Sequence, residues 1–412
     1  MNIKILKKES LRVHLLFMTI ALMYTFISYR SIQAPNFIFS GDQYFPFGLY
    51  ELNKAFLSIN ISKDLGLIDG YGAVLNFWDS IFYKIFYTVS EKFILAAKIN
   101  IFFYTYICLF TSYVGFKKWH EYLYFNKSNL AIYVAIFYTF SPYTLQLSHG
   151  GVFNITIALT YGLAPLALYL INELLNKKLI KNIDYIKIAF ILTIQTFQFW
   201  LFFTYVLIIM FYCIFNIIRC DDKLLVLKRL IILCLLYVAM TLLVSYPVVF
   251  QFLNNKYTIN SIFSPVFGNM QGGIWYQMKM LHSWGIYTVW EPRSMYSFGS
   301  YFFSDRYNFA IILLWSTLII GMSKILIDER NKTSLITDNK FFNIKIKSPI
   351  YPICKIENNN IAIYLLIILL ISLFFSKGAQ KPFGFIFLWL YENFSLFKIF
   401  RTPDIRFGFN II

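Results

Sequence analysis

The chain has 412 residues, of which 58% are apolar, 21% are aromatic and only 14% are charged. This is more apolar surface than the core of a water-soluble protein could bury, so the composition excludes an ordinary soluble domain. The net charge of +17 does not indicate nucleic-acid binding, because basic residues of membrane proteins gather on the loops beside the headgroups. The sequence therefore predicts an all-α, polytopic transmembrane helical bundle.

Apolar runs of about 17 to 25 residues, which is long enough to cross a hydrocarbon layer of about 30 Å, recur along the chain and predict at least seven spans. Basic residues beside a span resist translocation, so the lysine-rich N-terminus is expected in the cytoplasm. Residues 11–29 then cross outward, and this span is expected to be a retained anchor because it lacks a small-residue cleavage site. An outer segment with amphipathic stretches, about residues 30–90, follows, and residues 93–116 return.

The middle of the chain is predicted to contain a hairpin and a broken helix. Residues 130–143 and 152–175 form the hairpin, with Ser148-His149-Gly150-Gly151 at its outer tip. One helix through the apolar run 188–218 would leave the basic residues that follow it outside. We therefore interpret this run as two half-depth helices that turn near residues 195–198.

The last part of the chain is predicted to form a second large outer segment and a cytoplasmic loop. Residues 230–252 lead outward to this second segment, about residues 253–306, and residues 308–324 return. Residues 325–360 are rich in basic side chains and form the predicted cytoplasmic loop, after which residues 361–375 cross outward. The remaining residues are predicted to lie outside or to re-enter the membrane.

No repeat and no soluble domain is visible, so residues 1–412 are interpreted as a single transmembrane domain. The final Asn410-Ile411-Ile412 is typical of the start of another span, and we expect the domain to be incomplete at its C-terminus. The richness in lysine, isoleucine and asparagine is typical of a low-GC microbe. The predicted location is therefore the plasma membrane of an archaeon or bacterium.

Ionisable groups at the outer ends of spans are the first candidates for chemistry, because polar residues beside a bilayer are costly. The motif Ser40-Gly41-Asp42-Gln43-Tyr44-Phe45-Pro46 follows the first span, and Glu51 and Asp69 lie farther along the same outer segment. A carboxylate such as Asp42 can act there as a general base, because it stays ionised near the headgroups while partly shielded from water. The same motif is also typical of a turn.

Histidine and aromatic residues mark two further outer clusters. His149 at the hairpin tip either contacts a substrate or caps a helix, and it has no partner at metal-ligand spacing. The second outer segment alternates tryptophan and tyrosine with His282, Glu291 and Arg293. Such a pattern suits a carbohydrate, because rings cover apolar sugar surfaces and polar side chains bond the hydroxyls, and it equally suits an interfacial aromatic belt.

The last cluster, Phe400-Arg401-Thr402-Pro403-Asp404-Ile405-Arg406-Phe407, places two arginines around a proline at the outer face. Guanidinium groups bind phosphate bidentately, so Arg401 and Arg406 are candidates to hold a lipid phosphate or pyrophosphate. The alternative is that both side chains extend toward lipid headgroups. No P-loop, Rossmann, zinc or serine-hydrolase motif is present, so no cofactor is predicted, and a requirement for a divalent cation is left open.

Taken in order, these motifs resemble the GT-C class of membrane glycosyltransferases, in particular the arabinofuranosyltransferase-like and YfhO-like proteins. The resemblance covers most of the chain and depends on the order of short motifs together with the topology. The motifs are Gly41-Asp42-Gln43-Tyr44-Phe45-Pro46, Asn76-Phe77-Trp78, Ser141-Pro142-Tyr143, Leu163-Ala164-Pro165-Leu166 and Phe400-Arg401-Thr402-Pro403.

The resemblance implies an inverting enzyme that transfers a sugar from a polyprenyl-phosphate donor to a glycan or glycolipid acceptor at the outer membrane face. Asp42 occupies the place of the family's base, and Arg401 and Arg406 would steady the departing phosphate. The chain lacks the paired acidic motif that some branches carry, so a second carboxylate would have to come from Glu51 or Asp69. It also ends where related chains continue with further spans.

Two other functions stay open at the level of the sequence. A transporter or flippase of lipid-linked sugars also needs polar residues and a basic clamp, but transporters place broken helices near the midplane and show inverted repeats. A non-catalytic membrane scaffold is the third alternative. Loss of activity on substitution of Asp42 would separate the enzyme from the other two.

Overall fold

The computed structural model is almost entirely helical over the residues that it describes, as predicted, apart from turns and one short β-hairpin. The described residues are 3–28, 81–82, 84–90, 92–124, 129–141, 143–145, 155–177, 179–196, 199–220, 222–254, 278–279, 287–288, 291–294, 304–338, 358–394 and 397.

Four helical stretches in this described part are long and apolar enough to cross a membrane, judged by length and composition. They are Lys98–Leu123, Ile157–Asn176, Lys223–Val244 and Asp305–Lys324. Each overlaps a predicted span, so the prediction of membrane-spanning helices is confirmed at this coarser level. Shorter apolar helices, among them Leu11–Ile27 and Ile363–Ser376, coincide with further predicted spans.

The chain forms two compact units, each built from segments that are distant in the sequence. Unit 1 comprises Met1–Leu170, Ile186–Phe203 and Cys234–Asn260. Unit 2 comprises Ile171–Tyr185, Thr204–Leu233 and Ser261–Ile412.

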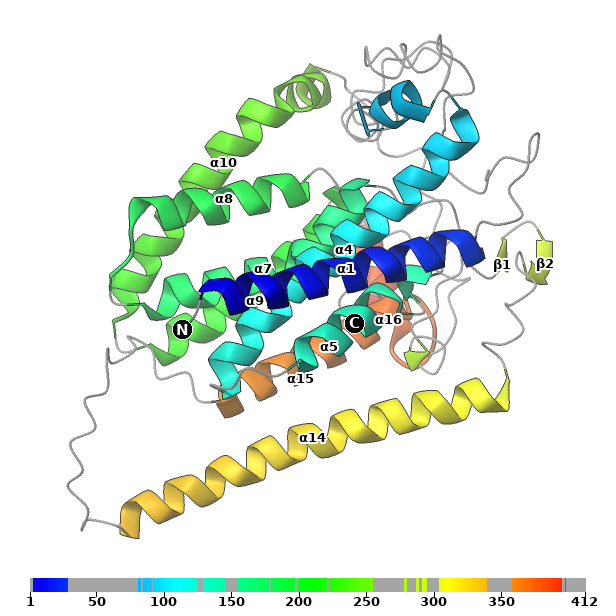
Figure 1. Cartoon of the computed structure of the whole chain (residues 1–412). Helices are drawn as coiled ribbons and strands as arrows, with labels where there is room; N and C mark the ends of the chain where they lie inside the picture. Colours follow the sequence, from blue (N-terminus) through cyan, green and yellow to red (C-terminus); the bar gives the residue numbers. More distant parts are fainter. Residues whose placement is uncertain are drawn as a thin grey trace. The chain divides into compact units, whose positions relative to one another are not determined.

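The core of unit 1 forms where α1 (Ile3–Ser28) and α5 (Leu130–Thr139) pack against α4 (Phe93–Tyr124) (Figure 1). Small residues at the contact let the helix backbones approach, and aromatic rings fill the space around them. The buried residues of this core are Phe17, Ala21, Leu109 and Ala135.

Glycines bring α4 close to the part of α7 (Ile155–Asn176) that belongs to unit 1. A Cβ atom on Gly115 would lie 2.5 Å from the backbone nitrogen of Leu166 and 2.8 Å from Pro165 Cβ. A Cβ on Gly162 would collide with the hydroxyl of Thr111. Because lipid tails supply no hydrophobic driving force between helices, close packing of this kind is a main source of helix association.

The apolar run that is predicted to form two helices contains α8 (Asn182–Thr196) and α9 (Phe199–Arg219), and residues 197–198 of the predicted turn lie outside the described residues. At 1.5 Å per residue α8 is about 22 Å long, too short to cross a bilayer, whereas α9 is about 31 Å long. A half-depth position therefore suits the length of α8 better than that of α9. The next helix, α10 (Lys223–Asn254), is N-capped by Asp222, which accepts a bond from the backbone N–H of Leu225 at 3.0 Å.

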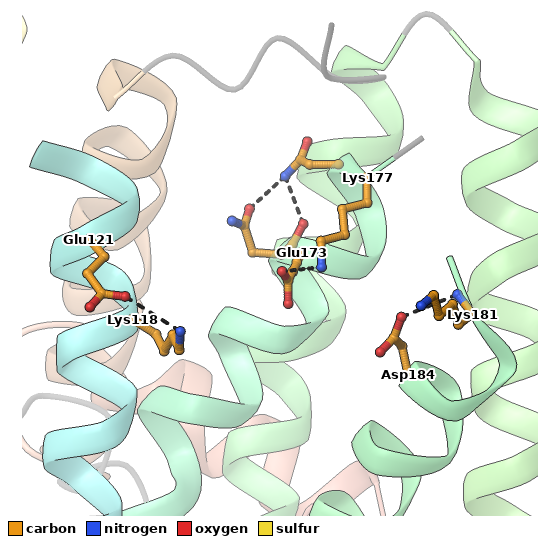
Figure 2. Close-up of polar contacts among 8 residues, drawn as sticks. Lys118, Glu121, Glu173, Lys177, Lys181 and Asp184 are labelled. Atoms are coloured by element: carbon orange, nitrogen blue, oxygen red, sulfur yellow. Dashed lines mark hydrogen bonds and ion pairs between the residues drawn. The ribbon is translucent and has the colours of Figure 1, made fainter. Parts of the chain in front are cut away.

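Two helices continue past the spans predicted for them, residues 93–116 and 308–324. Helix α4 extends through Lys117 and Lys118, and Lys118 pairs with Glu121 at 3.5 Å along the helix surface (Figure 2). Helix α14 (Asp305–Asp338) covers the first part of the predicted loop 325–360. Apolar pattern locates the membrane-crossing part of a helix, but a helix can continue in water through side-chain pairs one turn apart.

In unit 2, α14 packs against α15 (Asn358–Ser376), and a tight turn leads from α15 to α16 (Gly384–Asn393). The second outer segment contains a short antiparallel hairpin of β1 (Tyr287–Thr288) and β2 (Glu291–Ser294). This hairpin is an exception to the all-α prediction.

Candidate functional site

Most of the predicted site residues lie outside the described part of the chain. Glu291 and Arg293 are placed on strand β2, where Glu291 pairs in register with Thr288 of β1. The proposed chemistry of the others depends on the sequence alone. Those outside the described residues are Asp42, Glu51, Asp69, His149, His282, Arg401 and Arg406.

Two tyrosines in the core of unit 1 donate hydrogen bonds to each other's backbone carbonyls. The hydroxyl of Tyr138 donates to the carbonyl of Tyr161 at 3.0 Å, and the hydroxyl of Tyr161 donates to the carbonyl of Tyr138 at 3.1 Å. The two rings are stacked with centroids 4.0 Å apart. Pro165 explains the first bond, because proline has no N–H to donate to the carbonyl four residues earlier, which belongs to Tyr161. The second bond serves a carbonyl in the last turn of α5, where helical donors run out.

This tyrosine pair joins two of the sequence motifs, Ser141-Pro142-Tyr143 and Leu163-Ala164-Pro165-Leu166. Ser141 Oγ lies 2.9 Å from Thr144 Oγ1 and 3.4 Å from the hydroxyl of Tyr161. On the other side, the indole N–H of Trp119 donates to the carbonyl of Pro165 at 2.9 Å. The described residues of both motifs are therefore parts of one buried joint between helices, and this joint flanks the segment that contains His149.

Hydrogen bonds link the C-terminal end of α8 to α7 and to α10. Thr160 Oγ1 donates to the carbonyl of Gln195, and Gln195 Nε2 donates back to the carbonyl of Thr160, both at 3.0 Å. On α10, the hydroxyl of Tyr237 lies 3.1 Å from Thr196 Oγ1. Gln195 Oε1 is buried and has no hydrogen-bond partner among the described residues, so the end of α8 presents a free acceptor inside the unit.

Unit 2 contains a second buried polar cluster, made of amides and a tyrosine. Asn176 Nδ2 donates to Asn172 Oδ1 at 2.8 Å, and the hydroxyl of Tyr212 on α9 donates to the same oxygen. Asn216 Nδ2 donates to the carbonyl of Tyr212 at 2.7 Å. Asn172 Nδ2 and Asn176 Oδ1 have no partner in the described part of the chain, so one donor and one acceptor are left in the cluster.

Helix α14 anchors a piece of the second outer segment, at residues 278 and 279. The hydroxyl of Tyr307 donates to the carbonyl of Lys279, and the indole N–H of Trp315 donates to the carbonyl of Met278, both at 2.8 Å. Lys279 itself is buried, and the loss of water around its ammonium group lowers its pKa. Tyr307 and Trp315 therefore hold the backbone of residues 278 and 279 against α14 by hydrogen bonds.

The buried polar groups of the described residues are neutral hydrogen-bonding groups and a few cations. Their buried charged side chains are Arg229, Lys279 and Lys377, and none is a carboxylate. No group of three or more histidines, cysteines or acids that could hold a metal ion occurs among the described residues.

The candidate site residues predicted from the sequence lie in the outer segments, so they do not include the polar residues that are buried inside the apolar runs. A signal was available, since polar side chains within membrane helices are costly and are usually paired. The disulfide-bonded Cys220 was also missed, because the spacing of the five cysteines suggests no framework. The overlooked polar residues are Tyr138, Thr160, Tyr161, Asn172, Asn176, Gln195 and Asn216.

Comparison with known proteins identifies no relative, because no family model, curated protein or solved structure matches the chain. The function is therefore argued from the chain's own residues.

Proposed function

We propose that the chain is a polytopic membrane glycosyltransferase with a GT-C-like bundle. It takes a sugar from a polyprenyl-phosphate donor and transfers it to a glycan or glycolipid acceptor at the outer face of the plasma membrane. The observation that carries the proposal is the order of the motifs along a chain of membrane-length apolar helices. Further support comes from the buried joint, in which Ser141 of one motif lies 3.4 Å from the hydroxyl of Tyr161, two residues before another motif.

The proposed reaction needs one base and one anion-binding group. Asp42 takes the proton of the acceptor hydroxyl, whose oxygen attacks the anomeric carbon in line with the leaving group. The bond between that carbon and the lipid phosphate oxygen breaks, and the configuration inverts. Arg401 and Arg406 neutralise the charge that develops on the departing phosphate.

The other predicted residues have supporting roles in this proposal. Glu51 and Asp69 lie on the same outer segment as Asp42 and would orient the acceptor. His149, His282, Glu291 and Arg293 would bond sugar hydroxyls, and of these Glu291 and Arg293 belong to strand β2. The N-terminus lies in the cytoplasm, which places all of these residues on the outer side.

A transporter of lipid-linked sugars is the second candidate, and one structural observation favours it. Helix α8 ends at Thr196 within an apolar run, and Gln195 Oε1 beside this end is buried without a hydrogen-bond partner among the described residues. Broken helices with free polar groups are typical of substrate sites in secondary transporters. Against this candidate, the sequence shows no inverted repeat.

Asp42→Asn is the substitution that tests the proposed enzyme. Membranes that contain the wild-type chain are expected to transfer radiolabelled sugar from polyprenyl-phosphate donors into glycolipid or polymer, and the variant is expected to lose at least about 100-fold in rate, as is typical when a general base is removed. The matched control is Asp184→Asn, because Asp184 lies on α8 and its carboxylate bonds the backbone N–H of Lys181. Equal rates for wild type and Asp42→Asn would remove the base assignment. Movement of labelled donor between leaflets without any transfer to an acceptor would establish the transporter instead.

A further inference from the structure

In unit 2, a buried arginine links the beginning of α10 to the end of α7. Arg229, in the second turn of α10, is only 5% exposed. Its Nη1 donates to the carbonyl of Leu174 at 2.9 Å and to the carbonyl of Lys177 at 2.6 Å, at the end of α7. The beginning of α10 is thereby fixed beside the turn that joins α7 to α8.

Three exposed lysines lie on the segments that Arg229 links, and the described acids of these segments make local bonds. Lys181, Lys223 and Lys228 are exposed and have no ion pair among the described residues. The neighbouring acids make local bonds. Figure 2 shows Glu173 paired with Lys177 and Asp184 bonded to the backbone of Lys181, while Asp222 caps α10. The positive charge of the three lysines is therefore available to an outside partner.

Two strongly exposed leucines lie on the segments that Arg229 links. Leu179, between α7 and α8, is 90% exposed, and Leu224, in the first turn of α10, is 78% exposed. Each stands next to lysines in the sequence. Apolar side chains this exposed gain free energy by entering the acyl region of a bilayer, whereas a soluble polyanion would leave them in water.

The position of these turns on the helices points to the same partner. The stretch of α7 that could cross a membrane ends at Asn176, and that of α10 begins at Lys223. The lysines and leucines therefore lie at the boundary between the membrane and water, beside the headgroups. Basic residues within reach of anionic headgroups each contribute about 1 kcal/mol to binding.

From these observations we infer that Lys181, Lys223, Lys228, Leu179 and Leu224 form a binding surface for anionic phospholipids. The ammonium groups bind the lipid phosphates, and the two leucines enter the acyl layer below them. We name these five residues the lysine–leucine surface. This binding is independent of the proposed sugar transfer, because it involves other residues and, by the predicted orientation, the cytoplasmic leaflet.

The test compares lipid binding by the full-length chain purified in neutral detergent. Fluorescent phosphatidylglycerol is titrated into the wild-type chain and into the variant Lys181→Gln/Lys223→Gln/Lys228→Gln, with phosphatidylcholine and inorganic phosphate as competitors. Wild type is expected to prefer phosphatidylglycerol, and the affinity is expected to fall about fivefold for each lysine removed. Inorganic phosphate is expected to compete poorly, because it cannot use the leucines.

A matched control carries the same change of charge elsewhere, at the exposed residues Lys92, Lys324 and Lys381. The control variant is expected to bind phosphatidylglycerol as wild type does. The variant Leu179→Ser/Leu224→Ser is expected to lose affinity while keeping its preference for the anionic lipid, and it supplies an independent readout if the lysine variant does not fold. Equal losses in the control and the lysine variant would overturn the inference, as would tighter binding of heparin than of phosphatidylglycerol by the wild-type chain.

Discussion

Pro165 and Tyr138 illustrate how a single missing donor shapes the structure at the scale of the residue. Proline within α7 removes the N–H that would serve the carbonyl of Tyr161, and the hydroxyl of Tyr138 replaces it at 3.0 Å. A backbone carbonyl left without a donor in a buried site costs about 1 to 3 kcal/mol. The tyrosine is therefore required because the proline is present.

We expect Tyr138→Phe to lower the free energy of unfolding by about 1 to 3 kcal/mol, since the carbonyl of Tyr161 then loses the hydroxyl that replaces the missing N–H of Pro165. Adding Pro165→Ala restores an N–H and should recover most of this loss. The measurement is a double-mutant cycle of unfolding in detergent micelles. Tyr133→Phe is the control, because Tyr133 is on the same helix and 70% exposed. Additive effects of the two substitutions would contradict the explanation.

Lys377 is fully buried at the end of α15, and its ammonium group organises the turn that follows. Nζ donates to the carbonyls of Gln380, at 2.7 Å, and of Pro382, and it lies 4.8 Å from the centre of the Phe374 ring. Burial disfavours the charged form and lowers the pKa of Lys377 below its ordinary value of 10.5.

This lowered pKa predicts a pH dependence of stability. Between the folded pKa of Lys377 and 10.5 the unfolded chain binds the proton more tightly, so the stability of the folded state rises with pH across this window. Lys377→Met removes the titrating group and should remove this rise. The check is the midpoint of thermal unfolding in detergent from neutral pH to about pH 10.5. Parallel curves for the two proteins would show that the lysine does not titrate on unfolding.

At the scale of the element, glycines decide which helices can approach each other. The Cβ of an alanine at position 115 would lie 2.5 Å from the backbone of Leu166, whereas one at position 321 in α14 would meet no atom within 4 Å. The two glycines therefore have opposite roles, although both lie inside helices.

Gly115→Ala is expected to destabilise the chain by about 1 to 3 kcal/mol, because α4 and α7 are forced apart. Gly321→Ala is the matched control, and it is expected to stabilise by about 0.5 to 1 kcal/mol through the lower entropy of the unfolded chain. Unfolding in detergent measures both. A destabilised Gly321 variant, or a Gly115 variant as stable as wild type, would show that the packing of α4 and α7 differs from that described.

At the scale of the whole molecule, the orientation of the chain in the membrane decides which turns lie on the outer side. The turn between α7 and α8 is basic and is predicted to lie in the cytoplasm, while the start of α14 is predicted to lie outside. Exposed positions on each side make this testable, because Asn182, at the start of α8, and Asp305 both have exposed side chains.

In intact cells, a membrane-impermeant maleimide is expected to label Asp305→Cys and to leave Asn182→Cys unlabelled. Inverted vesicles are expected to give the reverse, because charged reagents cross the bilayer slowly. The wild-type chain supplies the background from its own cysteines. Labelling of Asn182→Cys in intact cells would invert the proposed orientation and would move Asp42 and the arginines to the cytoplasmic side.

The sequence predicted more about the helices than about the candidate site. Apolar length predicted the membrane-length helices, while the turn predicted near residues 195–198 falls partly on residues outside the described ones and stays a prediction. The ends of α4 and α14 could not be read in this way, because helical pairs in water leave no apolar signal. For the candidate site, the motifs indicated Asp42 and the arginines, which lie outside the described residues and stay predictions.

The sequence by itself determined the class of the protein, since 58% apolar residues in runs of membrane length can only be satisfied by helices that bond their own backbone. It also determined where basic turns interrupt those helices. Only the tertiary structure decided which polar groups meet inside them. Tyr138 and Tyr161 are 23 residues apart, and Arg229 lies 52 residues from Lys177. Contacts over such distances follow from the packing of helices, which local patterns do not encode.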